Sequence, residues 1–400
     1  MPITNYYIPE GMQDFLPDEC YNKRQIEDMV RNSFYSSGYN EVETPAFEHF
    51  DMFAYEKSPI EQQSMYKILE AGSPILVLRP DFTMPIARLT ANKFKDTLLP
   101  IRLFYIGNVY RYEDIQIAKQ REIAQAGAEL LGISGPEGDG EIIAMAIQSL
   151  IDLKLTDFKI DIGQVEFFKG LIEEAQLNND TAEKIRIFID HKDMLGLELF
   201  LKSLSVSDEI KQILWQLPRL YGNIDVLNEA TDLTKNRRCL DAIDNIYQVY
   251  EILKDYGFER YISFDLGMVQ SINYYTGIIF RGIIRSLSYP ICGGGRYDNL
   301  VRRFGYDIPA TGFALGIKRI LVSIERQNGL RHVPNIDVLI SFDRSSRKQA
   351  YKMAEKLKTK RQRIELFYSG SWSSAKDYAL EKGIKKVLLI TDNIIKEVVI

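Results

Sequence analysis

Residues 165–255 constrain the fold most, because they show only helical patterns while strand patterns lie on both sides. Within this stretch apolar residues recur at helical spacing, for example from Asp208 to Leu220. A strictly alternating strand pattern, Phe158–Ile162, precedes it, and another strand pattern, Tyr261–Asp265, follows it. We therefore predict one core domain at residues 1–325 that is interrupted by a helical insertion at about 165–255.

The predicted core domain contains short consecutive strands with helices beside them. Strand patterns occur at Ile101–Arg111 and Arg121–Leu130, and a helix with Ile26, Val30 and Phe34 at four-residue spacing precedes them. A parallel sheet built from β-α-β units would alternate strands and helices regularly, which is not the order here. The expected fold is therefore α+β, with a sheet rich in antiparallel strands.

A separate small unit is predicted at residues 333–400, because the pattern changes after Pro334. Two strand patterns in this region are each followed by a helical pattern, and two further strand patterns come after them. This order is typical of a small α/β domain.

Composition limits the class of protein. With 400 residues, of which 46% are hydrophobic, the chain has apolar material for two or three domains. No run reaches the roughly 20 apolar residues of a membrane helix, no signal-peptide pattern opens the chain, and the three cysteines lack metal-ligand or disulfide spacing. A net charge of -5 is a weak argument against a nucleic-acid partner. We expect a cytoplasmic protein with no membrane partner, no metal and no cofactor.

One predicted strand, Arg121–Glu129, has a polar face. Its residues Arg121, Gln125 and Glu129 point to one side, and three alanines point to the other. Gly127 leaves room between the polar side chains. Carboxylate and amide oxygens accept hydrogen bonds from an ammonium group and an imidazole, and arginine pairs with an anion. This face suits a small zwitterion, although a solvated polar strand would show the same pattern.

Two further segments are candidates for the same pocket. Asp81 and Thr83 follow a predicted buried strand and could add acceptors, or they could form an ordinary strand-end turn. Tyr274 and Tyr275 offer flat aromatic walls with hydroxyl groups, or belong in part to the core. The glycine run Gly293–Gly295 allows close approach of a ligand or of another strand, and it matches no phosphate-binding motif.

Taken in order, these segments resemble the histidyl-tRNA synthetase family along nearly the whole chain. The resemblance begins at Pro9–Pro17 and continues through Gly38–Pro45, the turn that Arg79 opens and the segment Tyr274–Gly277. It implies a class II aminoacyl-tRNA synthetase-like antiparallel sheet flanked by helices, a homodimer formed through that core, and a histidine pocket. The positions that match the family's histidine-binding residues are Asp81, Thr83, Arg111, Glu113, Gln125, Glu129, Tyr274 and Tyr275.

The departures from that family fall where its ATP chemistry occurs. The family's catalytic arginine is Gln270 here, the acid of its third motif is Lys318, and the loop Ile115–Glu122 lacks the family's proline, glycine and one arginine. Adenylation needs cations where charge gathers in the transition state, and glutamine supplies none. The sequence therefore predicts a chain without catalytic activity.

A histidine pocket without adenylation groups resembles the family of ATP phosphoribosyltransferase regulatory subunits, as do the turn Leu78–Thr83 and the segment Gln270–Tyr275. This resemblance implies a non-catalytic chain that joins the short-form catalytic subunit in a hetero-octamer of four plus four chains. It would be needed for the activity of that subunit in the first step of histidine biosynthesis and for feedback inhibition by histidine. The last unit is also shorter than the anticodon-binding domain of a synthetase, which argues against a tRNA partner.

Two other functions fit the same residues. The chain could be a divergent histidyl-tRNA synthetase, or a free-standing histidine sensor without an enzyme partner.

Overall fold

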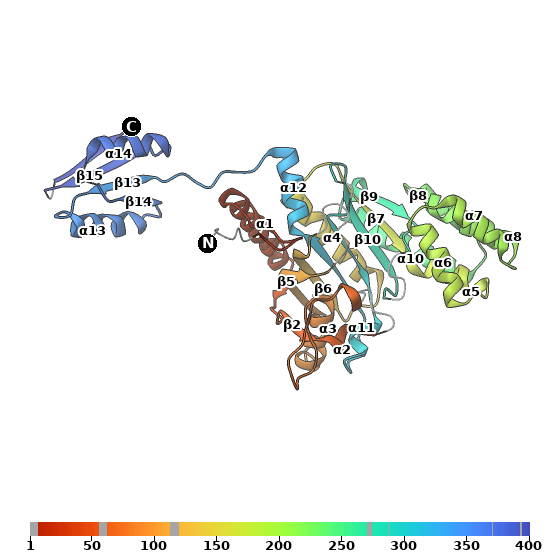
Figure 1. Cartoon of the computed structure of the whole chain (residues 1–400). Coiled ribbons are helices and arrows are strands. Elements are labelled where there is room, and N and C mark those ends of the chain that lie inside the picture. Colours follow the sequence, from red (N-terminus) through yellow and green to blue (C-terminus); the bar gives the residue numbers. More distant parts are fainter. Residues whose placement is uncertain are drawn as a thin grey trace. The chain divides into compact units, whose positions relative to one another are not determined.

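The computed structural model of this chain describes residues 7–55, 62–112, 120–269, 274–287, 289–369, 371–392 and 394–400, and a nine-stranded sheet dominates it. The chain divides into two units, Met1–Leu330 and Arg331–Ile400 (Figure 1). The large sheet belongs to the first unit, and each unit has its own hydrophobic core.

The large sheet is mostly antiparallel. Its strands, in spatial order, are β1 (Asn40–Glu41), β5 (Ile101–Tyr110), β6 (Glu122–Leu131), β12 (Ala310–Gly316), β11 (Cys292–Arg296), β10 (Ile278–Ile284), β7 (Phe158–Gln164), β9 (Ile262–Asp265) and β8 (Tyr221–Gly222). Every neighbouring pair from β5 to β7 is antiparallel, whereas β1 runs parallel to β5, and β9 runs parallel to β7. The predicted α+β fold with an antiparallel-rich sheet is thus confirmed.

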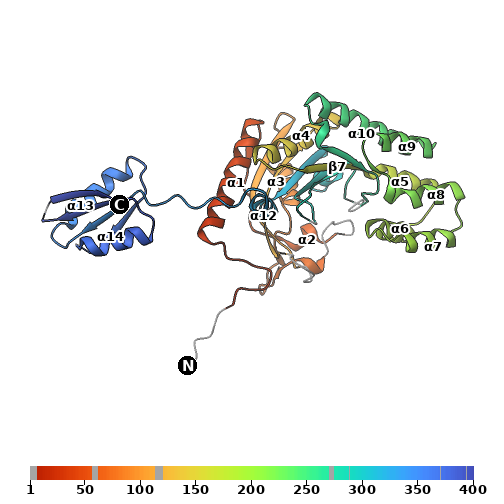
Figure 2. The same cartoon turned by 90° about the horizontal axis from the view of Figure 1, so that it is seen from above.

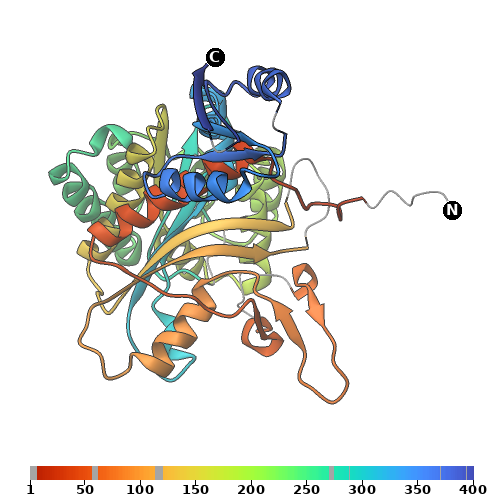
Figure 3. The same cartoon turned by 90° about the vertical axis from the view of Figure 1, so that its left-hand side faces the viewer.

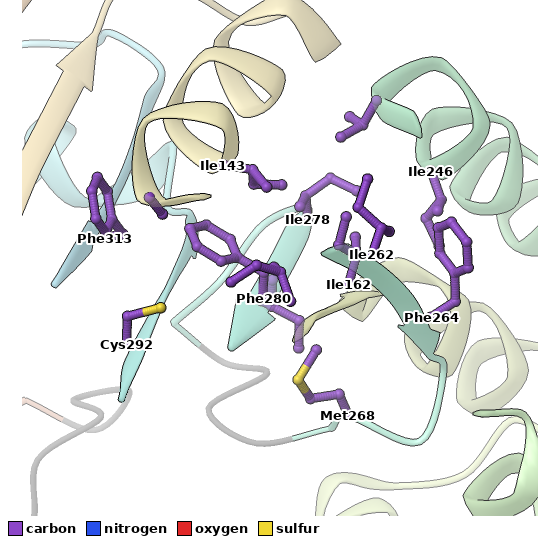
Figure 4. Close-up of a cluster of buried hydrophobic side chains, with 14 of the residues drawn as sticks. Ile143, Ile162, Ile246, Ile262, Phe264, Met268, Ile278, Phe280, Cys292 and Phe313 are labelled. Atoms are coloured by element: carbon purple, nitrogen blue, oxygen red, sulfur yellow. The ribbon is translucent and has the colours of Figure 1, made fainter. Parts of the chain in front are cut away.

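Helices and a large hydrophobic core cover one face of this sheet. Four of the helices that contribute to this core are α1 (Pro17–Ser36), α4 (Pro136–Asp152), α10 (Arg237–Asp255) and α12 (Ile317–Asn328). Ala126 and Ala128 of β6 are fully buried in the same core. Figure 4 shows part of it, with Ile143 of α4 on one side and Ile246 of α10 beside Phe264 of β9 on the other. The predicted first helix is confirmed, since its marker residues Ile26, Val30 and Phe34 are buried here.

A smaller layer covers part of the opposite face. Its elements are β2 (Phe47–His49), α2 (Phe50–Phe53), β3 (Lys67–Ile68), β4 (Leu76–Leu78), α3 (Thr83–Lys93) and α11 (Asn299–Arg302). Met84 and Ile86 of α3 pack against Leu103 of β5 in a second core. Figure 3 shows the long pair β5 and β6 with α3 beside it. Residues 79–83 connect β4 to α3 within this layer, and Phe82 packs against Tyr105 of β5, so this segment lies over the sheet.

Between β7 and β9 the chain forms six α-helices and the short strand β8. The helices are α5 (Val165–Glu174), α6 (Asn179–Asp190), α7 (Met194–Ser203), α8 (Asp208–Gln216), α9 (Asp225–Leu233) and α10. Side-chain oxygens cap several of them, as Asn178 does for α6 and Asn236 for α10, and such caps stabilise a helix by about 1 kcal/mol each. Figure 2 shows α6 beside α7, and α10 along α4. Helix α10 also packs against α5, so the insertion is anchored to the core through α10 and β7.

The second unit is a small α/β domain. Its sheet has the order β14 (Ile364–Phe367), β13 (Val338–Phe342), β15 (Lys386–Thr391) and β16 (Ile394–Val399), with helices α13 (Arg347–Lys358) and α14 (Trp372–Glu381). Helix α13 packs on Ile340 and Ile390, and α14 packs on Leu339 and Val387, so both faces of the sheet contribute to a core. Three short 3-10 helices complete the described elements of the chain, at Gln62–Ser64, Leu217–Arg219 and Glu259–Tyr261.

Within the described ranges, no helix combines the length and the apolar character that crossing a membrane requires.

Candidate functional site

Strand β6 turns its polar residues away from the helices. Ala126 and Ala128 face the core, so Ile123, Gln125 and Glu129 face the opposite side and line a cavity of about 440 Å³. A Cβ atom on Gly127 would collide with the hydroxyl of Tyr105 and with the carbonyl oxygen of Phe313. Glycine is required at this position because two neighbouring strands approach it closely.

Seven of the eight predicted pocket residues line this single cavity. They come from the start of α3 and the segment before it, from the residue after β5, from β6 and from the segment before β10, and they are Asp81, Thr83, Arg111, Gln125, Glu129, Tyr274 and Tyr275. The eighth, Glu113, lies outside the described residues, as do Gln270 and most of the loop Ile115–Glu122.

The cavity has two ends. In the pairing of β6 with β12, Glu129 lies opposite Gly312 and Gln125 lies opposite Gly316. These positions are four residues apart along the strand, roughly 13 Å. We group the other lining residues by their contacts: the carboxylate end holds Glu129 with Asp81, Thr83, Arg111, Tyr274, Tyr275 and Tyr297, and the arginine end holds Gly316 with Arg281, Pro290, Ile291, Cys292 and Arg319.

Glu129 is the most buried charged residue of the carboxylate end, with 1% of its surface exposed. Its carboxyl group accepts hydrogen bonds from the hydroxyl of Thr83, at 3.2 Å, and from the hydroxyl of Tyr297. Burial raises the pKa of Glu129 to about 8, although these two hydrogen bonds oppose the rise. A cation that enters the cavity would favour the ionised carboxylate, so Glu129 is suited to bind one.

Asp81 provides a second carboxyl group close to the first. Burial raises the pKa of Asp81 to about 6, and the nearby positive charge of Arg111 opposes the rise. The side chain of Asp81 accepts a hydrogen bond from the backbone nitrogen of Met84 at 3.2 Å, which ties it to the first turn of α3. Arg111 donates from Nε to the carbonyl oxygen of Pro80 at 2.8 Å. The carboxylate end therefore holds two acidic groups and one cation in set positions.

Tyrosine rings form the wall of this end. The rings of Tyr274 and Tyr275 lie edge to face at 5.0 Å, and Tyr274 stacks on Tyr297 at 5.7 Å. Burial raises the pKa of Tyr275 to about 12 and that of Tyr274 well above its usual value. These hydroxyl groups therefore stay protonated and can donate hydrogen bonds at neutral pH.

Sequence reasoning missed two tyrosines of the cavity, Tyr105 and Tyr297. Tyr105 lies opposite Gly127 in the pairing of β5 with β6, and its ring stacks on Phe82 at 4.1 Å. A tyrosine opposite a glycine on a polar strand face is a signal that could have indicated Tyr105. Tyr297 stands two residues after the glycine run Gly293–Gly295, but only the hydrogen bond to Glu129 reveals its place in the cavity.

Arg79, which opens the matched turn, does not line the cavity. It is 8% exposed and donates to the carbonyl oxygens of Asn108, at 2.9 Å, and Thr44, at 2.5 Å. Its guanidinium group also lies 4.1 Å from the ring centre of Phe82. Arg79 therefore positions the turn before α3 and does not face a ligand.

The cations of the arginine end are engaged by the protein itself. Arg281 pairs with Asp161 at 3.3 Å and with Asp265 at 2.9 Å. Arg319 donates to the carbonyl oxygen of Pro290 at 2.6 Å and lies over the ring of Tyr289. Cys292 is buried beside them, and burial raises the pKa of its thiol to about 12. Phosphate groups would have to compete with these contacts for either arginine.

The described part of the chain contains no group of three or more histidine, cysteine, aspartate or glutamate side chains that could hold a metal ion.

Comparison with known proteins gives one consistent result. Residues 11–320 match the family model described as histidyl-tRNA synthetase. The chain is 43% identical to the ATP phosphoribosyltransferase regulatory subunit of Acetivibrio thermocellus and 45% identical to that of Ruminiclostridium cellulolyticum, and in both cases the match covers 97% of this chain and 93% of the relative.

Comparison with solved structures leads to the same families. A crystal structure from Bacillus halodurans, described as an ATP phosphoribosyltransferase regulatory subunit/histidyl-tRNA synthetase, superposes with a TM-score of 0.84 at 32% identity, over 95% of this chain and 97% of that one. The histidyl-tRNA synthetase of a Nostoc species superposes with a TM-score of 0.81 at 20% identity, over 99% of this chain and 97% of that one, which shows the shared fold. The predicted class II synthetase-like architecture is thus confirmed.

Proposed function

Because the chain belongs to the family of ATP phosphoribosyltransferase regulatory subunits, we propose that it controls a separate catalytic chain of that enzyme in response to histidine. In this proposal histidine binds in the carboxylate end of the cavity, and the chain performs no chemistry of its own. The catalytic chain is active only in the assembly, and histidine bound to the regulatory chain inhibits it. We further propose the predicted hetero-octamer of four plus four chains, built on a homodimer of the core domain.

The arrangement around Glu129 carries this proposal. Histidine offers an ammonium group, a carboxylate and a ring with two nitrogens. Glu129 and Asp81 can accept from the ammonium group and the imidazole, and Arg111 can pair with the carboxylate. Tyr275 offers an aromatic face, and Gln125, four residues along β6 toward the arginine end, lines the same cavity with an amide that both donates and accepts. Glu113 is part of the proposed pocket by its place in the matched motif.

The state of the arginine end supports a non-catalytic role. Adenylation of histidine would need cations aimed at the phosphates of ATP. Arg281 is paired with two aspartates, and Arg319 is bound to a backbone carbonyl. In the sequence, Gln270 stands where the synthetases have their catalytic arginine. These residues favour a chain that binds histidine without activating it.

Inhibition by histidine imposes a thermodynamic requirement on this proposal. Histidine must bind the inhibited assembly more tightly than the active one, because a ligand with equal affinity for both states shifts neither. By the same linkage, the catalytic chain in its active state must weaken histidine binding to this chain. Affinities for histidine measured with and without the catalytic chain should therefore differ.

The test combines this protein with a short-form ATP phosphoribosyltransferase catalytic chain. We expect this protein to raise the activity of the catalytic chain, and histidine to lower it again. Titration calorimetry should show histidine binding to this chain alone, and histidine-dependent ATP–pyrophosphate exchange should be absent. Robust exchange would instead identify a synthetase, and histidine binding without any effect on the catalytic chain would identify a free-standing sensor.

A further inference from the structure

Helix α5 of the insertion holds the segment that carries Tyr275. Lys169 donates from Nζ to the carbonyl oxygen of Tyr275 at 3.0 Å. One turn earlier in the same helix, the backbone nitrogen of Val165 donates to the carbonyl oxygen of Gly277 at 3.2 Å. The side chain of Tyr275 lines the cavity. The insertion therefore contacts the backbone of the same residue whose ring faces the proposed ligand.

Lys169 is itself held in place by a chain of ion pairs. Glu166 accepts from Lys169 at 2.9 Å, and Arg238 of α10 donates to the other oxygen of Glu166 at 2.8 and 2.5 Å. Burial alone would raise the pKa of Glu166, but the contacts with Lys169 and Arg238 outweigh it and leave the pKa below its usual value. Glu166 therefore stays ionised near neutral pH. The Lys169 side chain is 26% exposed and that of Glu166 is 25% exposed, so solvent screens these contacts only in part.

The other side of the segment is tied to the sheet. The backbone nitrogen of Thr276 donates to the carbonyl oxygen of Arg296 at 2.8 Å, and its hydroxyl accepts from the backbone nitrogen of Asp298 at 3.0 Å. The segment Tyr275–Gly277 thus lies between β11 on one side and α5 on the other. Loss of either support would leave part of the cavity wall to be ordered by the ligand.

We propose that Lys169 is a positioning residue through which the helical insertion sets the Tyr275 wall of the cavity. This inference rests on the proposed binding of histidine. According to this proposal, Lys169 does not touch the ligand. It raises the affinity for histidine because it orders the Tyr275 wall before histidine binds. A wall ordered in advance saves the ligand the free energy of ordering it. A contact that changes how α5 and α10 pack would, by linkage, change the affinity for histidine.

The experiment compares Lys169→Met with Lys202→Met in the full-length chain. Methionine keeps much of the length of lysine and removes the donor. Lys202 lies on α7 of the same insertion and pairs only with the exposed Glu198 among the described residues. Titration calorimetry should show histidine binding weakened about tenfold by Lys169→Met and unchanged by Lys202→Met. Lys169→Arg, which keeps a charged donor, should recover most of the affinity.

Hydrogen exchange separates this inference from the proposed function. In the ligand-free protein, the amide of Thr276 should exchange about tenfold faster in Lys169→Met than in Lys202→Met. If the wild-type chain does not bind histidine, the proposed function fails, and this exchange rate alone decides the role of Lys169. Equal exchange rates in the two variants would overturn the inference. If Lys169→Met does not fold, Glu166→Gln takes its place and should also weaken histidine binding and speed the exchange of the Thr276 amide, both to a smaller extent. The absence of both effects in Glu166→Gln would equally overturn the inference.

Discussion

The two ends of the cavity contain similar numbers of charged groups but use them in opposite ways. At the carboxylate end, Glu129 and Asp81 have raised pKa values because burial outweighs the groups that oppose it. At the arginine end, Arg281 and Arg319 are already bound by the protein. A buried group whose charge is not yet compensated can gain free energy from a ligand, whereas a compensated one has little to gain. The difference favours the carboxylate end as the place of the proposed binding.

The largest expected effect follows removal of the charge at the carboxylate end. Glu129→Gln keeps the shape of the side chain and removes its charge, so histidine binding should weaken by about a hundredfold, because its cation would lose its buried partner. Titration calorimetry checks this value. Glu122→Gln is the matched control on the same strand, since Glu122 bonds to Asn108 and does not line the cavity. Equal affinities of the two variants for histidine would show that Glu129 does not take part in histidine binding.

The second largest effect is expected from a side chain added at Gly127, beside Glu129. Gly127→Ala places a methyl group against Tyr105 and the Phe313 carbonyl and should lower the free energy of unfolding by about 2–3 kcal/mol. Gly293→Ala is the control in the same cavity, because the nearest atom to its new Cβ is 3.4 Å away. Urea unfolding of both variants measures the difference. Similar stabilities of the two variants would contradict the close packing of β5, β6 and β12 around Gly127.

The raised pKa values of the carboxylate end predict a pH dependence of stability in the ligand-free protein. An acid whose pKa rises on folding binds its proton more tightly in the folded state and thereby raises the free energy of unfolding. This contribution is complete below the pKa of the unfolded state and is lost as the pH rises through the pKa of the folded state. For Glu129 this window runs from 4.5 to about 8, and for Asp81 from 3.8 to about 6.

The free energy of unfolding should therefore fall between pH 5 and pH 8, and Glu129 should account for about 3 kcal/mol of the fall. Glu129→Gln cannot ionise and should lose that part of the pH dependence. Urea unfolding of wild type and variant at both pH values gives the comparison. A wild-type pH dependence identical to that of Glu129→Gln would show that Glu129 titrates normally.

The smallest effect is expected at the arginine end. Arg319→Met should change the affinity for histidine by less than about twofold, because Arg319 is occupied by the Pro290 carbonyl and lies at the far end of the cavity. Calorimetry under the conditions used for Glu129→Gln provides the measurement. A loss comparable to that of Glu129→Gln would mean that both ends contribute to histidine binding, and the contrast between them would be lost.

Local patterns predicted much of the fold and of the pocket. The alternation of polar residues and alanines in β6 placed Gln125 and Glu129 on one face, where the structure has them. The strand pattern Phe158–Ile162 became β7, and the helical pattern that starts at Asp208 became α8. Such patterns work because a strand or helix that lies against a core must repeat its apolar residues with its own period.

Contacts between distant segments escaped prediction. The turn at Arg79 matched a family motif, yet its arginine binds backbone carbonyls and not the cavity. The hydrogen bond from Tyr297 to Glu129 joins residues 168 positions apart, and that from Lys169 to Tyr275 joins residues 106 positions apart. No local period records such pairs, because they depend on how strands and helices pack once formed.

The sequence by itself determined the antiparallel sheet, the helical insertion pattern and the kinds of side chain available for binding, because these depend on local periodicity and residue chemistry. Only the tertiary structure decided which charges are compensated. The sequence shows that Glu129 and Asp81 are acidic, but their raised pKa values come from burial by segments far along the chain. Burial depends on the position of every packed neighbour, and for that reason the contrast between the two ends of the cavity exists only in the folded chain.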